Sequence, residues 1–167
     1  MLCAYAAASS GCGYALAGRG SFLPASIRTV GIPTLENRST FFQVEDILTE
    51  KIRSEFIGRG KYQTPPDASA ADAVLQGEIV AITSQVAGTT AQQLASRYLV
   101  TVVLKVTLTD VRTREVLWSN DSLTIRDEYD LVGGIDGATF VDQQRGMVER
   151  IATDVARAVV TAIAEAF

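Results

Sequence analysis

Residues 98–109 contain the longest alternation of apolar and polar side chains in the sequence. The apolar positions are Tyr98, Val100, Val102, Leu104, Val106 and Leu108, and polar side chains at Thr101, Lys105, Thr107 and Thr109 lie between them. Successive side chains of a strand point to opposite faces, so this period of two predicts a long antiparallel strand with one solvated face. Such a strand needs neighbouring strands and an apolar layer to cover its other face.

The segments on either side of this strand complete an antiparallel unit. The charged run 110–115 predicts a turn, and Val116–Arg126 predicts the returning strand of a hairpin, with Trp118 as an apolar anchor. Upstream, Val74–Thr83 predicts a strand that carries Leu75, Ile79 and Ala81 on one face, and a loop is expected over 84–96.

One more strand of the sheet is expected nearer the N-terminus, and residues 61–64 are a candidate for an additional short strand outside the count of four. Ser26–Pro33 predicts the first strand, with Val30 and Ile32 on one face and Pro33 ending it. Residues 61–64 predict a short strand, and residues 67–71 predict a turn or a single helical turn. A polar loop is expected over 35–39.

Two further segments have helical periodicity. Thr40 and Gln43 fit a capping box, and an apolar stripe follows at Val44, Ile47, Leu48, Ile52 and Phe56. After an irregular segment at 128–139, a second stripe predicts a long helix ending near Phe167; its members are Met147, Val148, Ile151, Val155, Val159, Ala162 and Ile163. The predicted fold is α+β with two layers: a mostly antiparallel four-stranded sheet with two amphipathic helices packed on one face.

Composition excludes several kinds of function. The chain has no histidine, and its only cysteines are Cys3 and Cys12, so zinc sites and triads built on histidine are not expected. The acidic residues are scattered rather than paired, and no catalytic constellation can be assembled. The net charge of −4 disfavours a nucleic-acid binder with a broad basic surface. We therefore expect no enzyme activity, cofactor or metal.

The N-terminus ends in a motif that resembles the lipobox of bacterial lipoproteins. An apolar stretch leads into Ser9-Ser10-Gly11-Cys12, although no basic residue precedes it and Ser9 stands where leucine is usual. The interpretation is a truncated signal peptide at residues 1–11, lipid attached to Cys12, and a single domain over 12–167. A tail with an incidental cysteine is the alternative.

A series of motifs resembles the lipopolysaccharide-assembly lipoprotein family, LptE. They occur in the family's order over nearly the whole mature chain: Cys12-Gly13-Tyr14, Gly18-Arg19-Gly20, Leu23-Pro24, residues 27–33, residues 36–40, residues 71–79, Arg97-Tyr98, residues 110–118 and the closing helix. The resemblance implies an outer-membrane lipoprotein, facing the periplasm, that plugs the LptD β-barrel translocon, assists its assembly and binds lipopolysaccharide in transit. Gly13 after the cysteine is consistent with sorting to the outer membrane.

Basic residues near the predicted hairpin are the candidates for contact with lipopolysaccharide. Arg97, Lys105, Arg112 and Arg114 qualify, because clustered guanidinium groups bind phosphate with two hydrogen bonds each. The alternative interpretation is that these are solvated residues at strand ends.

A second class of envelope protein shares part of the pattern. Residues 30–33 and 36–39 also resemble the opening of CsgG-like secretion lipoproteins and of penicillin-binding-protein activators, which scaffold or activate other machines. Those domains alternate strands and helices more regularly. Three consecutive strands between Val74 and Arg126 favour the LptE resemblance.

Overall fold

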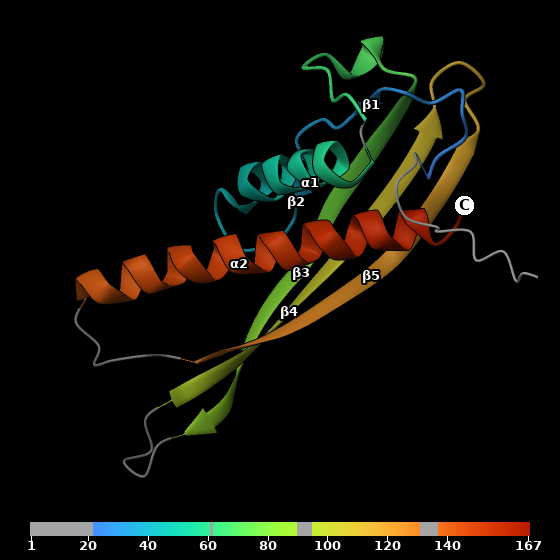
Figure 1. Cartoon of the computed structure of the whole chain (residues 1–167). Helices are drawn as coiled ribbons and strands as arrows, with labels where there is room; N and C mark the ends of the chain where they lie inside the picture. The colour runs from blue at the N-terminus through green and yellow to red at the C-terminus, as the bar shows by residue number, and fades with distance from the viewer. Residues whose placement is uncertain (1–21, 61, 90–94, 131–136) are drawn as a thin grey trace, which may run out of the picture.

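A computed structural model describes residues 22–60, 62–89, 95–130 and 137–167 (Figure 1). Three long strands, β3 (Ala73–Thr89), β4 (Ala95–Asp110) and β5 (Val116–Asp130), form an antiparallel meander. Two short strands, β1 (Val30–Gly31) and β2 (Glu36–Asn37), pair in parallel with β3. The predicted α+β class and mostly antiparallel sheet are confirmed, although the sheet of the described residues has five strands rather than four.

Two helices, α1 (Val44–Gly60) and α2 (Gly137–Ala164), cover one face of the sheet (Figure 1). The buried face of β4 is the predicted one, with Val100, Val102, Leu104, Val106 and Leu108 nearly inaccessible. Both helical stripes are also confirmed, since the members buried against this face are Val44, Leu48, Ile52 and Phe56 from α1, and Ile151, Val155, Val159 and Ile163 from α2. One apolar core therefore joins the two layers.

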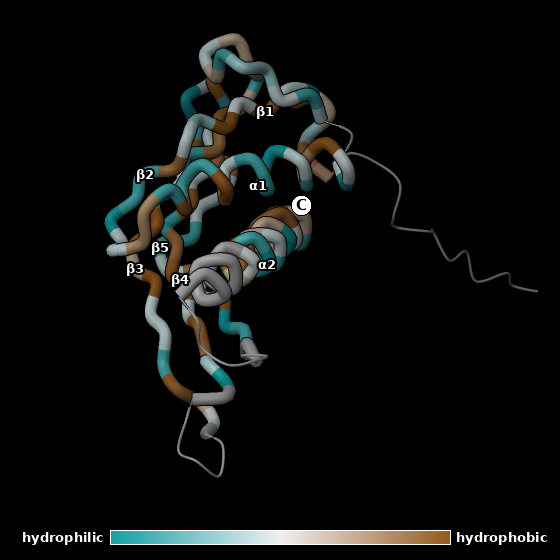
Figure 2. Tube along the Cα trace, turned by 90° about the vertical axis from the view of Figure 1, so that its left-hand side faces the viewer, coloured by the Kyte–Doolittle hydropathy of each residue, from teal (hydrophilic) through white to brown (hydrophobic). Residues whose placement is uncertain are grey.

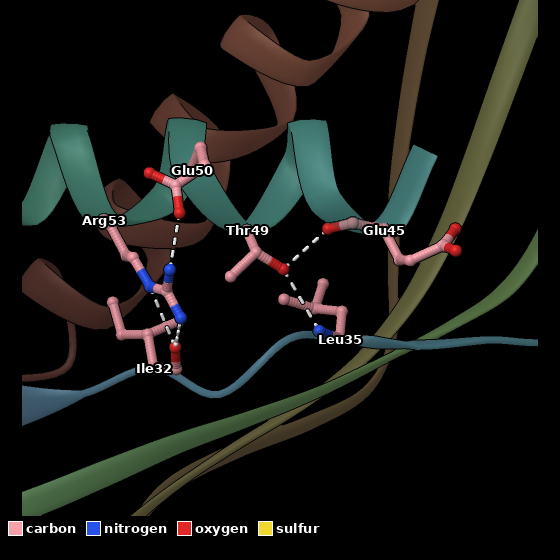
Figure 3. Close-up of polar contacts among 6 residues, drawn as sticks. All are labelled: Ile32, Leu35, Glu45, Thr49, Glu50 and Arg53. Carbon is pink, nitrogen blue, oxygen red and sulfur yellow. Dashed lines mark hydrogen bonds and ion pairs between the residues drawn. The ribbon is translucent and has the colours of Figure 1, made fainter. Parts of the chain in front are cut away.

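Side chains of α1 hold the extended segment between β1 and β2 against the helix (Figure 3). The buried Thr49 hydroxyl accepts a hydrogen bond from the Leu35 N–H at 3.1 Å and donates one to the Glu45 carbonyl. One turn further along, the Arg53 guanidinium donates to the Ile32 carbonyl, with its Nε at 3.0 Å, and pairs with Glu50. These bonds satisfy backbone groups that no strand pairing satisfies.

Several N-terminal predictions were wrong in detail. The first strand is only Val30–Gly31, and the expected strand at 61–64 reduces to an isolated bridge between Thr29 and Gln63. Within the predicted polar loop, Glu36–Asn37 pairs with β3. The expected turn at 67–71 is confirmed as a 3-10 helix, η1 (Ala68–Ala70).

The prediction of a capping box at Thr40 and Gln43 was also wrong. Helix α1 begins at Val44, and Gln43 has a φ of 61°, so Thr40 lies too far upstream to cap it. Instead, the Asn37 side chain donates to the Phe41 carbonyl and to Glu45, both at 2.7 Å, and this fixes the loop that leads into the helix.

Strand β3 differs most from expectation, because it continues through much of the predicted loop at 84–96 to Thr89. A bulge at Val80 shifts the register, so that Ala81 pairs with Val103 of the outer face and Ile82 pairs with Val102 of the core face. Ala81 therefore leaves the face predicted for it. Strand β5 likewise continues to Asp130, and α2 begins at Gly137, inside the segment expected to be irregular.

The far ends of the long strands reach beyond the helical layer (Figures 1 and 2). Residues 83–87 of β3 are all exposed. This extension leaves both sheet faces uncovered there and gives the molecule its elongated outline.

Candidate functional site

The face of the sheet opposite the helices is polar, and we call it the outer face. On β4 it carries the predicted residues Thr101, Lys105, Thr107 and Thr109. The register brings Gln76 opposite Thr107, and Glu78 opposite Lys105, from β3. The predicted wet face is therefore confirmed, and it combines hydroxyl, amide and ionic groups with the valines Val74, Val103 and Val116.

Two ion pairs lie on this face. Lys105 Nζ lies 3.1 Å from Asp121 Oδ1, and Arg38 Nε lies 2.9 Å from Glu78 Oε1. A shallow cleft of about 350 Å³ lies beside these pairs, lined by Pro33, Thr34, Glu36, Gln76, Gly77, Glu78, Lys105 and Thr107. Because these ion pairs are largely exposed, they contribute little stability, and the surface is suited to polar contact with another molecule.

The turn between β4 and β5 is held by the carboxylate of Asp110. Its Oδ1 accepts hydrogen bonds from the N–H groups of Arg112 and Thr113, at 2.8 and 3.0 Å. The Thr113 N–H is the main reason why the pKa of Asp110 lies below its ordinary value. Arg114 takes a φ of 60° in this turn, and both arginines are exposed. Among the described residues, neither guanidinium lies within ion-pair distance of a carboxylate, but the positive charge of Arg112 is close enough to help lower the pKa values of Asp72 and Asp110.

A second carboxylate brings Arg28 to the same end of the sheet. Asp72 Oδ2 accepts hydrogen bonds from the Arg28 N–H at 2.9 Å, the Thr29 hydroxyl at 2.8 Å and the Thr29 N–H at 3.0 Å. The Asp72 carbonyl in turn accepts from Val111 of the turn. Arg28, Arg112 and Arg114 are thus exposed at one end of the sheet, and we call these three arginines the basic end. The carboxylates of Asp72, Asp110 and Glu115 lie at the same end and balance their charge.

Sequence reasoning missed Arg28, because its proximity depends on the pairing of β1 with β3. The motif 27–33 contained the residue, but nothing in its spacing pointed to the turn. The other predicted cations are not part of this group. Arg97 lies near the start of β4, 3.3 Å from Glu128, and roughly 40 Å of strand separates it from Asp110. Of the four candidates, the structure thus brings together Arg112 and Arg114 in the turn and not Arg97 or Lys105, and a role of any of them in contact with lipopolysaccharide stays a prediction.

We expect Asp72→Ala to lower the free energy of unfolding by about 1–3 kcal/mol at pH 7, because partly buried donors would lose their acceptor. Hydrogen bonds from Arg28 and Thr29 lower the pKa of Asp72 in the folded protein. Its stabilisation is therefore fully present above the unfolded value of about 3.9 and is lost as pH falls through the folded pKa. Urea denaturation at pH 7 and pH 3 measures this effect. The difference in free energy of unfolding between wild type and variant must be smaller at pH 3 than at pH 7.

Asp121→Ala is the matched control, because Asp121 is exposed and makes only a surface ion pair. This control should change stability little at either pH. If Asp72→Ala lowered the free energy of unfolding by the same amount at both pH values, the ionised Asp72 carboxylate would not be the stabilising group.

The part of the chain that the structure describes contains no group of three or more acidic or cysteine side chains placed to hold a metal ion. Neither α1 nor the described part of α2 is long and apolar enough to cross a membrane. Cys12 lies outside the described residues. The fold and surface thus define a small α+β module with a polar sheet face and a basic end, a class suited to contact with partners.

The chain belongs to the LptE family of lipopolysaccharide assembly, whose sequence profile matches residues 27–163. This match confirms the resemblance noted in the motifs, and the family is one of lipoproteins of the cell envelope. No curated protein sequence matches the chain.

Solved structures share the fold at low sequence identity. Rare lipoprotein B from Shewanella oneidensis is 10% identical, with a TM-score of 0.50, over 81% of this chain and 94% of that one. Protein CT253 from Chlamydia trachomatis is 12% identical, with a TM-score of 0.51, over 81% and 96%. Protein XCC0632 from Xanthomonas campestris is 15% identical, with a TM-score of 0.50, over 83% and 89%. At these identities the likeness concerns the fold alone.

Proposed function

We propose that this chain is a lipid-anchored protein on the periplasmic side of the outer membrane, where it plugs an LptD-like β-barrel and assists the barrel's assembly. In the same place it binds lipopolysaccharide on its way to the outer leaflet. The observation that carries the proposal is the family match over residues 27–163. The geometry is compatible with it, because the lumen of a large barrel is polar and filled with water, and the outer face is polar as well.

Binding of lipopolysaccharide is assigned to the basic end. Phosphate groups accept two parallel hydrogen bonds from a guanidinium, and Arg28, Arg112 and Arg114 are all exposed there. Arg97 and Lys105, by contrast, are paired with Glu128 and Asp121. The outer-face residues would then contact the barrel wall, and the arginines would contact the ligand.

Purification of the full lipidated chain from detergent-extracted membranes tests the partner. We expect an LptD-like barrel of large mass to co-purify, together with lipopolysaccharide. A peptidoglycan synthase in its place would favour the scaffold or activator alternative and would refute the plug.

We also propose Cys12 as the site of lipid attachment. One acyl chain holds a protein to a bilayer only marginally, so stable anchoring requires the multiple acylation of a lipoprotein cysteine. In a version with a complete leader, Cys12→Ser should move the protein from the membrane fraction to the soluble periplasmic fraction. Cys3→Ser is the control and should remain bound. Membrane retention of the Cys12 variant, with an intact mass that shows no lipid on the wild type, would exclude the anchor.

A further inference from the structure

The two long edges of the sheet differ in how well they are protected. On one side, β1 and β2 pair with β3 only as far as Ile79, where the Arg38 N–H donates to the Ile79 carbonyl at 3.0 Å. Beyond this point, no other strand of the described chain lies against β3 on that side. Figure 2 shows the lower part of β3 bare below β2. On the other side of the sheet, β5 is the edge strand.

The β5 edge has devices that prevent another strand from pairing with it. Asn120 accepts a hydrogen bond from the Ser122 N–H, and Asp127 accepts one from the Glu128 N–H, both at 2.9 Å. Two irregularities interrupt its register with β4, but both lie before Leu123, so at the level of residues 81–86 this edge is distinguished by its charged residues Arg126, Asp127 and Glu128. Charged side chains and bulges are the usual means by which edge strands avoid unwanted pairing.

The β3 edge has no comparable charge. From Ile79 to Ser96 the sequence has neither a charged residue nor a proline. Bulges flank the segment 81–86 on both sides, but within it the pairing with β4 is regular, from Ala81 opposite Val103 to Val86 opposite Tyr98. Val80 and Val86 expose 42% and 54% of their surface. Because backbone groups alternate sides along a strand, about half of those at 81–86 point away from β4 with no strand to pair with.

We infer that the free edge of β3, residues 81–86, is a strand-addition site for an extended segment of the barrel partner, an inference that rests on the proposed function. Unpaired N–H and C=O groups along an edge are satisfied by another extended backbone, which identifies the occupant as a strand. The side chains of 81–86 are all uncharged, and all but Gln85 are small or β-branched, which suits a neutral partner strand. A closed barrel has no free strand edge of its own, so the segment comes from a loop or a terminal extension of the barrel.

Thr83 and Thr124 provide a matched test. Both are exposed, both lie on the outer face, and they occupy the two opposite edges of the sheet at nearly the same level, Thr83 beside Thr101 and Thr124 beside Val103. A lysine at Thr83 adds the kind of charge that blocks edge pairing, and Thr124→Lys adds the same charge to the protected edge. Substitutions at exposed positions should leave the melting temperature of either variant close to that of the wild type.

The experiment uses the full lipidated chain in its native membrane. We expect Thr83→Lys to reduce the recovered LptD-like barrel roughly tenfold, the size of effect that follows from losing one or two backbone hydrogen bonds, and Thr124→Lys to leave recovery unchanged. A photoreactive benzophenone side chain at position 83 should cross-link to the barrel, and the same group at position 124 should not.

The outcomes separate the two proposals. If wild type recovers no barrel, the proposed function fails. If wild type recovers the barrel but Thr83→Lys does so equally well and position 83 yields no barrel adduct, strand addition fails while the plug stands. An adduct from position 83 with a second copy of this chain would also overturn the inference, because the edge would then be a dimer contact.

Discussion

Val102→Asp is expected to abolish the cooperative thermal transition and leave the chain unfolded at 25 °C. Val102 is 1% exposed at the centre of β4, between Ile82 of β3 and Ile125 of β5. A carboxylate there would be unpaired and buried, and such substitutions cost about 4–5 kcal/mol or more, comparable to the whole stability of a small domain. Far-ultraviolet circular dichroism measured with temperature is the test.

Thr101→Asp is the control, because its side chain lies on the outer face one residue away. This variant should melt within a few degrees of wild type. If Val102→Asp also melted cooperatively near the wild-type temperature, Val102 would not lie in the core and the assignment of the two faces of β4 would be wrong.

Elements that cover the core were predictable from the sequence, because burial on one side imposes a period. Strand β4 shows the alternation typical of a strand and the two helical stripes show the spacing typical of a helix, and their buried residues are the expected ones. The distal part of β3 has no such signal, because both of its faces are exposed beyond the helices and nothing constrains which side chains alternate. That is why residues 84–89 were predicted as a loop and form a strand.

Other features depend on contacts between distant residues. Strand β2 is two residues long, and its position depends on pairing with Glu78 and Ile79 of β3. The hydrogen bonds of Thr49 to Leu35 and of Arg53 to Ile32 join residues 14 and 21 positions apart, with no local pattern. Similarly, the charged turn with Arg112 and Arg114 could be predicted from the local sequence. The position of Arg28 near this turn depends on its hydrogen bond to Asp72, 44 residues away.

Replacing Arg112 and Arg114 by glutamate should weaken lipopolysaccharide binding roughly a hundredfold at low salt. Each guanidinium that binds phosphate contributes about 1.5 kcal/mol or more, and the net charge of −4 offers no compensating general attraction. Wild-type binding should weaken as salt rises, because contacts between exposed charges are screened, and the double variant should respond less to salt. Titration of purified protein into lipopolysaccharide at two salt concentrations measures both effects. Adding Arg28→Glu should weaken binding further.

The control carries the same change in net charge at the other end of the sheet. Arg97→Glu with Arg126→Glu alters two exposed arginines, and Arg97 lies roughly 40 Å of strand from Asp110, several Debye lengths away at physiological salt. If binding depends on the basic end, this pair should bind like wild type. Both double variants should melt within a few degrees of wild type, because the core is untouched and the charge interactions that they remove are largely exposed. Equal losses from the two pairs would mean that lipopolysaccharide responds only to total charge. If binding depended neither on salt nor on either pair of substitutions, the basic end would not be the site for lipopolysaccharide. That result would leave the contact with the barrel to the co-purification experiment.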